Sequence, residues 1–279
     1  MTALKVNTIL VTLDLEGNGI GPSGAQALSE ALKTNSTLTA LKLRYGSIGD
    51  NGVQALCEAV KTNSSLTTLR MENSAIGDNG AQALSEALMV NTTLATLTAL
   101  RLGHNSIGDN GVQALSEALK ANTVLVILDL GDNGIGPSGA QALSEALKTN
   151  SSLTTLELMY NSIGDSGAQA LTEALTTKST LTRLDLGDNE IHNQGAHALS
   201  EALKTNSALT FLHLDNNCIK DEGAQGLSEA LKTNSTLTNL YLSNNNIGPS
   251  GTQALSEVPK TNSTVTVFDI VSVGMIFGV

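Results

Sequence analysis

Charged and aromatic side chains return in this sequence at intervals of about 28 residues, always in the same local setting. One such series begins at Asp14 and then reads Lys42, Arg70, Arg101, Asp129, Glu157, Asp185, His213 and Tyr241. Three consecutive basic residues are therefore followed by three acidic ones, a two-signed row that could recognise complementary charges on another protein. Arg44, Tyr45, Tyr160, Phe211 and Asp215 stand in neighbouring positions. Exposed tyrosine and arginine often dominate the binding energy of protein interfaces.

Other chemistry is weaker in this set of residues. His213 and Asp215 fall near Asp185 and Asp188 in the repeat and could in principle hold a cation, but we interpret them as exposed polar side chains instead. His192 and His197 lack the spacing of zinc ligands, and the serines recur with the repeat, so none stands out as a nucleophile. The glycines recur as turn residues rather than as a phosphate-binding loop. We expect no catalytic residue, no metal, no cofactor and no small-molecule substrate.

The elements that position these side chains are written as a repeat. Full units begin at Leu10, Leu38, Leu66, Leu97, Leu125, Leu153, Leu181, Leu209 and Leu237. Their shared pattern is L-T-x-L-x-L-x-x-N-x-I-G-x-x-G-A-Q-A-L-S-E-A-L-K-T-N-S-T, with partial units at 1–9 and 265–279. A fixed period of this length indicates stacked structural units.

Each unit contains a strand followed by a helix. In "LTTLEL", Leu156 and Leu158 alternate with Thr155 and Glu157, which predicts a short strand with one buried face. In "SGAQALSEALKTN" (138–150) the apolar residues recur at helical spacing instead. Proline or an acidic residue opens this helix, as Pro137 and Asp165 do in two of the units. The third, fifth, seventh and eighth positions of the unit then carry the exposed side chains of the strand.

Stacked units predict a curved solenoid. Parallel strands lie about 4.8 Å apart, whereas packed helices need about 8–10 Å between their axes. We therefore expect a horseshoe in the α/β class, with a parallel sheet on the concave face and helices on the convex face. We predict a single domain over residues 1–279.

The ninth position is asparagine in most units, where an amide can satisfy buried backbone groups. Gly46 and Ser74 replace it in the second and third units. The segment "NTTLATLTAL" (91–100) then carries three extra residues. Because unsatisfied buried groups cost about 1–3 kcal/mol each, we predict the weakest seam of the solenoid here.

These motifs resemble the leucine-rich repeat superfamily over essentially the whole chain. The 28-residue form with "G-A-Q-A-L-S-E-A-L" resembles the ribonuclease-inhibitor-like subfamily, which includes the repeat regions of NOD-like receptors. The resemblance implies a protein-interaction scaffold that is not an enzyme. There are departures, because ribonuclease inhibitors are rich in cysteine and this chain has 2, and because no P-loop pattern is present.

Two alternatives to a concave interaction surface are open. The repeats also resemble those of Ran GTPase-activating proteins, which supply an arginine; Arg44 in "LKLRYGSI" or Arg101 in "LRLGHNSI" would then be the finger. The second alternative is drift, because exposed strand positions tolerate many polar side chains. Pro22, Pro137 and Pro249, together with Tyr45 and Tyr160, recur every four units, so duplication also explains part of the pattern.

The net charge and the cysteines indicate which kind of partner and which compartment to expect. The net charge is −11, with −2 in residues 1–124 and −9 in residues 125–279, which disfavours nucleic acid and anionic membranes. Cys57 and Cys218 form no disulfide framework, which predicts a reducing, cytoplasmic setting. The asparagines of six Asn-x-Ser/Thr matches recur with the repeat, so we interpret them as loop residues. They are Asn35, Asn63, Asn91, Asn150, Asn234 and Asn262.

The last helix and the apolar C-terminal run differ from the other units. Pro259 in "SEVPKTN" predicts an early break in that helix. The run "VTVFDIVSVGMIFGV" is either an atypical capping strand or part of a longer protein. We expect one partner protein on the concave face, with Arg44, Tyr45, Arg70 and Arg101 facing acidic groups and Asp129, Glu157 and Asp185 facing basic ones.

Overall fold

The fold is seen in a computed structural model, which describes residues 2–90, 96–177 and 180–270. The chain divides into two compact units, which are described separately. Unit 1 comprises Met1–Gly134 with Thr149–Leu153, and unit 2 comprises Ile135–Lys148 with Thr154–Val279. The expected seam at 91–100 falls partly on residues 91–95, which lie outside the described residues.

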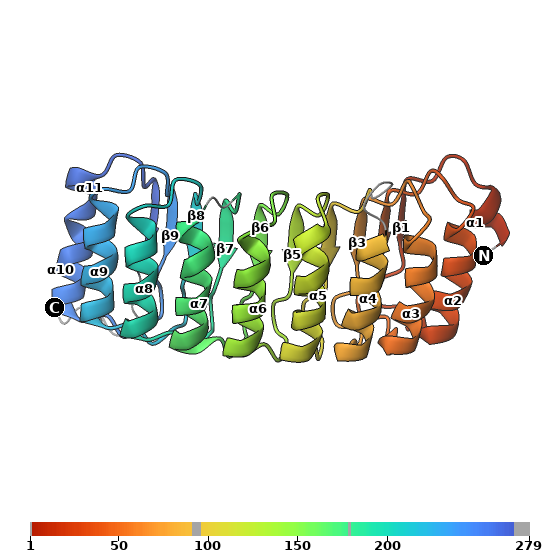
Figure 1. The fold of residues 1–279 in the computed structure, drawn as a ribbon, viewed down its shortest axis with the longest axis horizontal. Helices are drawn as coiled ribbons and strands as arrows, with labels where there is room; N and C mark the ends of the chain where they lie inside the picture. Colours follow the sequence, from red (N-terminus) through yellow and green to blue (C-terminus); the bar gives the residue numbers. More distant parts are fainter. Residues whose placement is uncertain (1, 91–95, 178–179, 271–279) are drawn as a thin grey trace, which may run out of the picture. The chain divides into compact units, whose positions relative to one another are not determined.

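Unit 1 alternates helices with short parallel strands, in chain order. Its elements are α1 (Thr2–Val6), β1 (Thr12–Asp14), α2 (Gly21–Leu32), β2 (Ala40–Lys42), α3 (Gly49–Val60), β3 (Thr68–Arg70), α4 (Asp78–Val90), β4 (Ala99–Arg101), α5 (Asp109–Ala121) and β5 (Ile127–Asp129). Each strand pairs with the next one along the chain, from β1 to β5. Figure 1 shows α2 to α5 side by side in this order.

Unit 2 repeats the same arrangement. Its elements are α6 (Pro137–Leu147), β6 (Thr155–Glu157), α7 (Gly164–Thr176), β7 (Arg183–Asp185), α8 (Asn193–Leu203), β8 (Phe211–His213), α9 (Asp221–Leu231), β9 (Asn239–Tyr241), α10 (Pro249–Ser256), α11 (Val258–Thr261) and β10 (Val267–Asp269). Its strands are also parallel and follow the chain order. The helix break predicted from Pro259 is confirmed, because α10 stops at Ser256 and a separate turn, α11, carries the proline.

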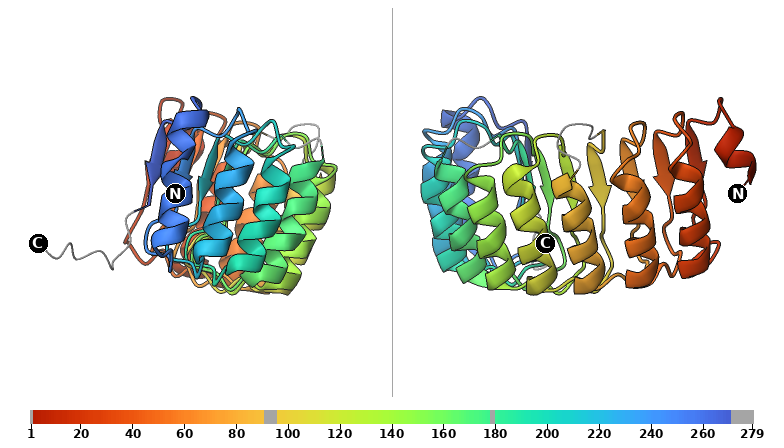
Figure 2. Two further views of the ribbon diagram at one scale, coloured as in Figure 1. Left: turned by 90° about the vertical axis from the view of Figure 1, so that its left-hand side faces the viewer. Right: turned by 45° about the vertical axis from the view of Figure 1, so that its right-hand side comes forward.

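In each unit the helices lie on one side of the strands, and the core fills the space between them (Figure 2). The alternation predicted for "LTTLEL" is confirmed, because Leu156 and Leu158 are fully buried while Thr155 and Glu157 are partly exposed. The apolar stripe of α6 is buried as well, including Ala140 and Leu143. The core is therefore almost entirely aliphatic, and the opposite face of the sheet is left to the variable side chains.

The asparagines of the ninth position do what the sequence predicts. Asn189 is fully buried, and its amide nitrogen donates to the carbonyls of Leu158 and Gly187 at 2.9 and 2.8 Å. Its side-chain oxygen accepts the N–H of Ile163 at 3.3 Å. Ser74, one of the two substitutions, still donates its hydroxyl to the carbonyl of Leu43 at 3.2 Å. These side chains join one repeat to the next where the strand ladder stops.

A second series of buried asparagines follows the helices. Asn63 donates to the carbonyls of Leu32 and Asn35 at 2.8 and 2.9 Å and accepts the N–H of Leu66 at 2.8 Å. Five of the six Asn-x-Ser/Thr asparagines belong to this series and are 4–8% exposed, and Asn91 lies outside the described residues. Asn122, which follows the three extra residues, differs: its amide nitrogen is buried and has no hydrogen-bond partner.

The helix starts show a role for the acidic residue that the sequence did not reveal. Asp165 accepts the backbone N–H groups of His192 and Gly195, both at 2.8 Å, so it caps the helix of the following repeat. Where proline replaces this acid, the following helix instead begins with a left-handed glycine. Gly164, which follows the repeat of Pro137, has φ +58°. Glycine adopts this conformation without the steric cost that other residues bear.

Candidate interaction surface

The exposed side chains of the strands form what we call the strand face, made of the third, fifth, seventh and eighth positions of each repeat. Neighbouring strands pair without a shift, so the same repeat position of adjacent strands lies side by side, as Lys42 does beside Arg70. The predicted residues divide between the units. Unit 1 carries Lys42, Arg44, Tyr45, Arg70, Arg101 and Asp129, and unit 2 carries Glu157, Tyr160, Asp185, Phe211, His213, Asp215 and Tyr241.

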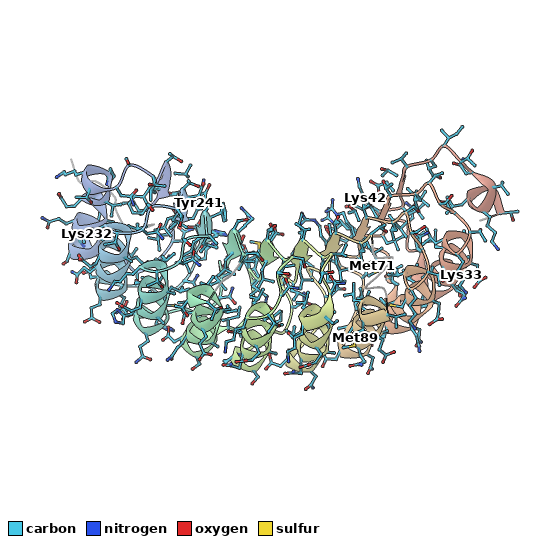
Figure 3. All side chains as sticks on the ribbon, turned by 45° about the horizontal axis from the view of Figure 1, so that its top comes forward. Lys33, Lys42, Met71, Met89, Lys232 and Tyr241 are labelled. Carbon is cyan, nitrogen blue, oxygen red and sulfur yellow. The ribbon has the colours of Figure 1, made fainter. Side chains whose placement is uncertain are left out.

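The strand face and the helix surface can be compared in Figure 3. Lys42 and Tyr241 belong to strands, whereas Lys33 and Lys232 lie at the ends of helices. The helix surface repeats one arrangement, a lysine paired with the glutamate three residues before it. These pairs are Glu30–Lys33, Glu58–Lys61, Glu117–Lys120, Glu145–Lys148, Glu201–Lys204, Glu229–Lys232 and Glu257–Lys260. The strand face has no such uniformity.

In unit 1 the basic side chains are paired within the face. Lys42 Nζ lies 3.1 Å from Asp14 of the preceding strand. Arg70 donates from Nε and Nη2 to one oxygen of Glu72, at 2.9 and 2.7 Å. Glu72 is only 4% exposed, and this contact raises the pKa of Arg70. The cations that the sequence suggested for an acidic partner are therefore already engaged by carboxylates of the chain itself.

Two further pairs complete this pattern. Arg101 Nη1 approaches Asp129 at 3.5 Å, and Asp129 also accepts the N–H of Gly131 at 3.0 Å. His104 contacts Asp132 through Nδ1. Basic and acidic members of the predicted row thus pair with each other inside unit 1. Lys42 pairs with Asp14, and Arg101 pairs with Asp129.

Arg44 is held from two sides. Its Nη1 lies 3.0 Å from Glu16, its Nη2 donates to the hydroxyl of Tyr45 at 3.2 Å, and its guanidinium carbon is 5.0 Å from the centre of the Tyr45 ring. A cation against an aromatic ring is favourable by about 0.5–1 kcal/mol at an exposed site. Tyr45 itself is 48% exposed and has φ +55°.

In unit 2 the centre of the strand face is an arginine that the row did not include. The guanidinium carbon of Arg183 lies 3.5 Å from the centre of the Phe211 ring. Its nitrogens are 3.6 Å from Glu157 and 3.7 Å from Asp185. The Phe211 ring in turn packs against Tyr241 with their centres 5.2 Å apart. Four predicted residues therefore gather around Arg183.

His213 is clamped between two carboxylates. Its Nδ1 lies 2.7 Å from Asp185 and its Nε2 lies 3.1 Å from Asp215. Burial lowers the pKa of His213, but the two carboxylates outweigh this, and the net effect raises it. Because a neutral imidazole has only one N–H, both contacts are hydrogen bonds only when the ring is protonated. Gly187 leaves room for the ring, since a Cβ there would lie 2.9 Å from His213 Cε1.

Asp188 completes the acidic side of unit 2. It accepts a hydrogen bond from the amide of Asn216 at 3.1 Å. Burial raises its pKa, and the nearby charges of Asp215 and Asp185 add to this against the lowering effects of Asn216 and His213. The ionised form of Asp188 is therefore less well supported than an ordinary surface aspartate.

The described part of the chain contains no metal site, and the thiol of Cys57 is buried. Residues 2–90, 96–177 and 180–270 contain no group of three or more His, Cys, Asp or Glu arranged to hold a metal ion. Both ring nitrogens of His213, the residue that suggested one, face Asp185 and Asp215. Cys57 is buried in α3, and burial raises the pKa of its thiol to about 12, which keeps it protonated and unreactive.

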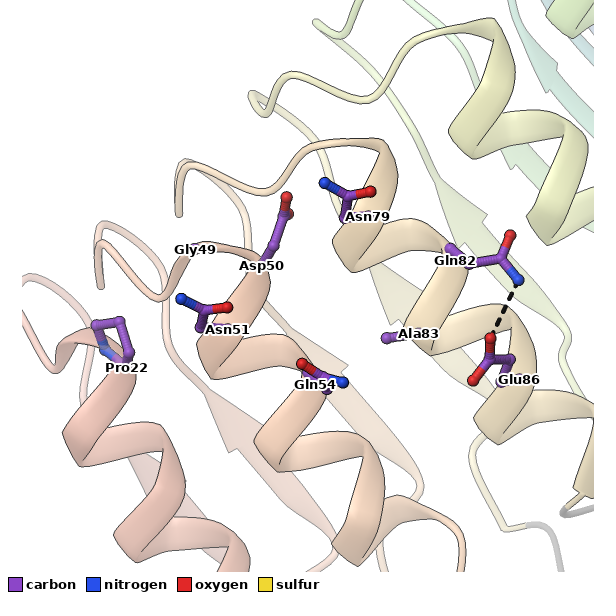
Figure 4. Close-up of a pocket in the computed structure, with 9 residues that line it drawn as sticks. All are labelled: Pro22, Gly49, Asp50, Asn51, Gln54, Asn79, Gln82, Ala83 and Glu86. Carbon is purple, nitrogen blue, oxygen red and sulfur yellow. Dashed lines mark hydrogen bonds between the residues drawn. The ribbon is translucent and has the colours of Figure 1, made fainter.

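One groove near the helices is lined mainly by polar side chains. It has a volume of about 520 Å³ and lies at the starts of α2, α3 and α4 (Figure 4). Asp50 in its wall already accepts the N–H of Gly77 at 2.7 Å, and Gln82 donates to Glu86 at 3.2 Å. Ligand sites are mostly apolar with a few converging polar groups, and this groove does not have that composition.

Sequence reasoning missed Glu16, Glu72 and Arg183, which hold or organise the predicted residues. A signal was present for each. Arg183 is the only charged residue at the third repeat position, and Glu16 and Glu72 flank Arg44 at the seventh. Their contacts depend on which strands are neighbours, so a reading of the fifth position alone could not find them.

A family comparison accounts for these repeats. The family model described as Leucine Rich repeat matches nine segments of the chain, at 6–29, 34–57, 62–85, 93–116, 121–144, 149–171, 177–200, 205–228 and 233–256. The chain belongs to the leucine-rich repeat family. Its fold is accordingly the α/β leucine-rich repeat solenoid that the strand–turn–helix pattern predicted. No relative is found among curated proteins.

Several solved structures are similar to this chain. An internalin from Listeria monocytogenes aligns with a TM-score of 0.54 at 19% identity, over 97% of this chain and 63% of its own. This chain thus spans 63% of the length of that internalin, and the likeness at this identity shows the fold alone. The yeast Rad7–Elc1 complex aligns with a TM-score of 0.46 at 14% identity, over 91% of this chain and 75% of that one. The tropomodulin C-terminal domain of Caenorhabditis elegans gives 0.45 at 17%, over 53% and 89%.

None of the helices in the described residues combines the length and apolarity that crossing a bilayer requires.

Proposed function

We propose that the chain is a non-enzymatic scaffold that binds another protein through its strand face. The observation that carries this proposal is the contrast between the two surfaces. The helix surface carries the same Glu–Lys pair in most repeats, whereas the side chains of the strand face change in almost every repeat. Positions that contact a partner are expected to differ from repeat to repeat, because each of them faces a different part of that partner; drift at exposed strand positions is the competing explanation.

The chemistry of the strand face supports the same proposal. All 3 tyrosines of the chain, Tyr45, Tyr160 and Tyr241, stand on it, and there are no tryptophans. Tyr45 and Tyr160 are each 48% exposed, and arginines pack beside Tyr45 and Phe211. Rigid aromatic side chains next to arginine are typical of the residues that contribute most to interface affinity. The net charge of −11 favours a protein partner over nucleic acid or an anionic membrane.

The GTPase-activating alternative has less support. An arginine finger must reach into a second protein, but Arg44 is held by Glu16 and Tyr45. Arg101 is likewise paired, with Asp129. The finer membership in the ribonuclease-inhibitor-like subfamily is also part of the proposal, and it rests on the helix-bearing 28-residue repeat.

The proposal is tested by capturing proteins from a cell lysate with three forms of the chain. The first is the wild type, and the second carries Tyr45→Asn and Tyr160→Asn. Asparagine suits this position, because Asn73, Asn216 and Asn244 occupy it with φ between +51° and +56°. The third form carries Lys33→Asn and Lys232→Asn on the helix surface (Figure 3). These are matched in number and in the residue introduced.

A specific partner that the strand-face variant loses and the helix-surface variant keeps supports the proposal. A partner kept by the strand-face variant and lost by the helix-surface variant would move the interaction surface to the helices. Asp185→Lys, which the row of charges also suggests, is a poor choice for this test. Asp185 is 5% exposed and bound to His213, so a lysine there would perturb the fold.

A further inference from the structure

Two tyrosines at the same repeat position have different neighbours. Tyr45 and Tyr160 both occupy the eighth position, both have φ +55°, and both are 48% exposed. The residue before Tyr45 is Arg44, and the residue before Tyr160 is Met159. The two repeats therefore present the same ring in the same backbone conformation, one with a cation supplied by the chain and one without.

The chain itself shows what such a ring accepts. At Tyr45 the Arg44 guanidinium lies 5.0 Å from the ring centre and 3.0 Å from the carboxylate of Glu16. In unit 2, Arg183 lies 3.5 Å from the centre of the Phe211 ring and within 3.7 Å of Asp185. Twice, then, the strand face holds a guanidinium between an aromatic ring and a carboxylate.

Tyr160 has the ring and the carboxylate but no guanidinium. Asp188 occupies the eighth position of the next repeat, on the adjacent strand, where the N–H of Tyr160 bonds the carbonyl of Gly187 at 2.9 Å. Within the described residues, the Tyr160 ring has no cation against it, and Asp188 has no cation in ion-pair contact, only the amide of Asn216 at 3.1 Å. Charge alone would not make this a site. An aromatic ring and a carboxylate are the two groups between which the chain holds its own guanidinium groups elsewhere.

We propose that Tyr160 and Asp188 bind an arginine side chain of the partner protein between them. At Tyr45 the carboxylate that holds the guanidinium comes from the preceding repeat, whereas at Tyr160 it comes from the following one. The proposal rests on the proposed function, because it assigns the partner to the strand face and adds its chemistry, an exposed arginine in a basic segment. The surrounding charge favours this occupant. Residues 125–279 carry −9, and Asp185, Asp188 and Asp215 stand together around His213, with Arg183 also 3.7 Å from Asp185. A guanidinium suits the site better than an ammonium, because it stacks flat on a ring and hydrogen-bonds a carboxylate at the same time.

The test measures the affinity of an acetylated, amidated hexa-arginine peptide by fluorescence anisotropy, with hexa-lysine as a second probe. Three variants change the net charge by the same single unit. Asp188→Asn removes the carboxylate of the site, Glu229→Gln removes an exposed carboxylate on the helix surface of unit 2, and Met159→Arg supplies an internal arginine to Tyr160. Each is compatible with the fold, since Asn216 and Asn244 occupy the position of Asp188, Arg44 occupies that of Met159, and Glu229 is exposed on α9.

We expect Asp188→Asn and Met159→Arg to weaken hexa-arginine binding by about 3- to 10-fold, the size of a cation–ring contact plus a partly exposed ion pair. Glu229→Gln should leave it within about 1.5-fold of the wild type, because an exposed charge on the helix surface is largely screened from the strand face. Hexa-lysine should bind more weakly than hexa-arginine.

Equal weakening by all three variants would show diffuse attraction to an acidic protein and overturn the proposal. Equal affinity for the two peptides would overturn the assignment of a guanidinium, and absence of hexa-arginine binding would overturn the site. None of these results touches the proposed function, which is decided by the capture of whole proteins with the tyrosine and lysine variants. A partner lost by the tyrosine variant but carrying no arginine-dependent contact would retain the strand face and reject this site.

Discussion

The strand faces of the two units are built on the same repeat but balance their charges differently. In unit 1, Lys42, Arg44, Arg70 and Arg101 each meet a carboxylate of the chain. In unit 2, Arg183 and His213 share the carboxylates around them, and Asp188 has only an amide. A surface that satisfies its own charges offers little to a partner, whereas one with an excess of carboxylates and an exposed ring gains from one. The same repeat can therefore produce either kind of surface through two or three substitutions.

Buried and exposed copies of one asparagine give the largest expected difference between the units. Asn189→Ala in unit 2 leaves the N–H of Ile163 without its partner and removes one of the two hydrogen bonds accepted by each of the carbonyls of Leu158 and Gly187. The loss of these three hydrogen bonds should lower the free energy of unfolding by about 3 kcal/mol. Asn18→Ala in unit 1 should cost about 0.5 kcal/mol or less, because Asn18 is exposed and bonds only the carbonyl of Glu16. Urea unfolding of both variants measures this. Equal losses of stability in the two variants would show that the burial of the asparagine and its hydrogen bonds do not decide its contribution.

The two kinds of helix start give the next largest effect. Gly164 begins α7 with φ +58°, so Gly164→Ala should lower the free energy of unfolding by about 1–2 kcal/mol. Gly108 precedes α5 with φ −95°, bonded to Asp78, and a Cβ there meets Asp78 Oδ1 at an ordinary 3.5 Å. Gly108→Ala should therefore cost less than about 0.5 kcal/mol. Urea unfolding again provides the measurement, and a cost at Gly108 as large as at Gly164 would contradict the capping account.

The repeat, its strand and helix, and the asparagines of the ninth position could be predicted from the sequence. They depend on a local pattern of residues that recurs through nine repeats. The sequence did not predict that Asp165 caps the following helix, nor that His192 and Lys220 are tolerated where other repeats have glycine. Both replacements follow repeats with a capping Asp165 or Asn193, and their backbones are extended rather than left-handed. Such a rule joins residues about 27 positions apart, which a reading within one repeat cannot detect.

His213 in unit 2 should make the stability of the chain depend on pH. Because the folded state raises the pKa of His213 above its ordinary value of 6.5, the stability it contributes is complete below that pH and is lost as pH rises through the folded-state pKa. Between pH 6 and 8.5 the wild type should lose more stability than His213→Gln. An unchanged slope in His213→Gln would contradict the clamp between Asp185 and Asp215.

Exchanging the residues before the two tyrosines should give the smallest effect. Arg44→Met removes the cation beside Tyr45 and should lower the free energy of unfolding by about 0.5–1 kcal/mol. Met159→Arg places one beside Tyr160 and Asp188 and should raise it by about 0.5 kcal/mol. Thermal unfolding of the two variants reports the signs. A change of the same sign in the free energy of unfolding of both variants would mean that the two tyrosines do not bind an arginine in the same way.

The site was less predictable than the fold, for a physical reason. The row of charges at the fifth position was visible in the sequence, but whether Lys42 is available to a partner depends on Asp14, 28 residues earlier. Arg183 was not predicted because it is the only charged residue among the third positions, which are otherwise uncharged, yet it stacks on Phe211. Side chains on neighbouring strands decide each other's availability, and that information is carried by register rather than by composition.

The central claim, that the strand face is where a protein binds, is tested most directly with ¹³C-labelled tyrosine. The chain has 3 tyrosines and all stand on this face, so the ring spectrum has one set of signals for each site. A partner captured from the lysate is added, and its binding is confirmed independently by sedimentation. The account predicts that the Tyr160 signals shift on binding while those of Tyr45, whose ring is already occupied by Arg44, move less. A bound partner that leaves all three sets of signals unchanged would contradict the account.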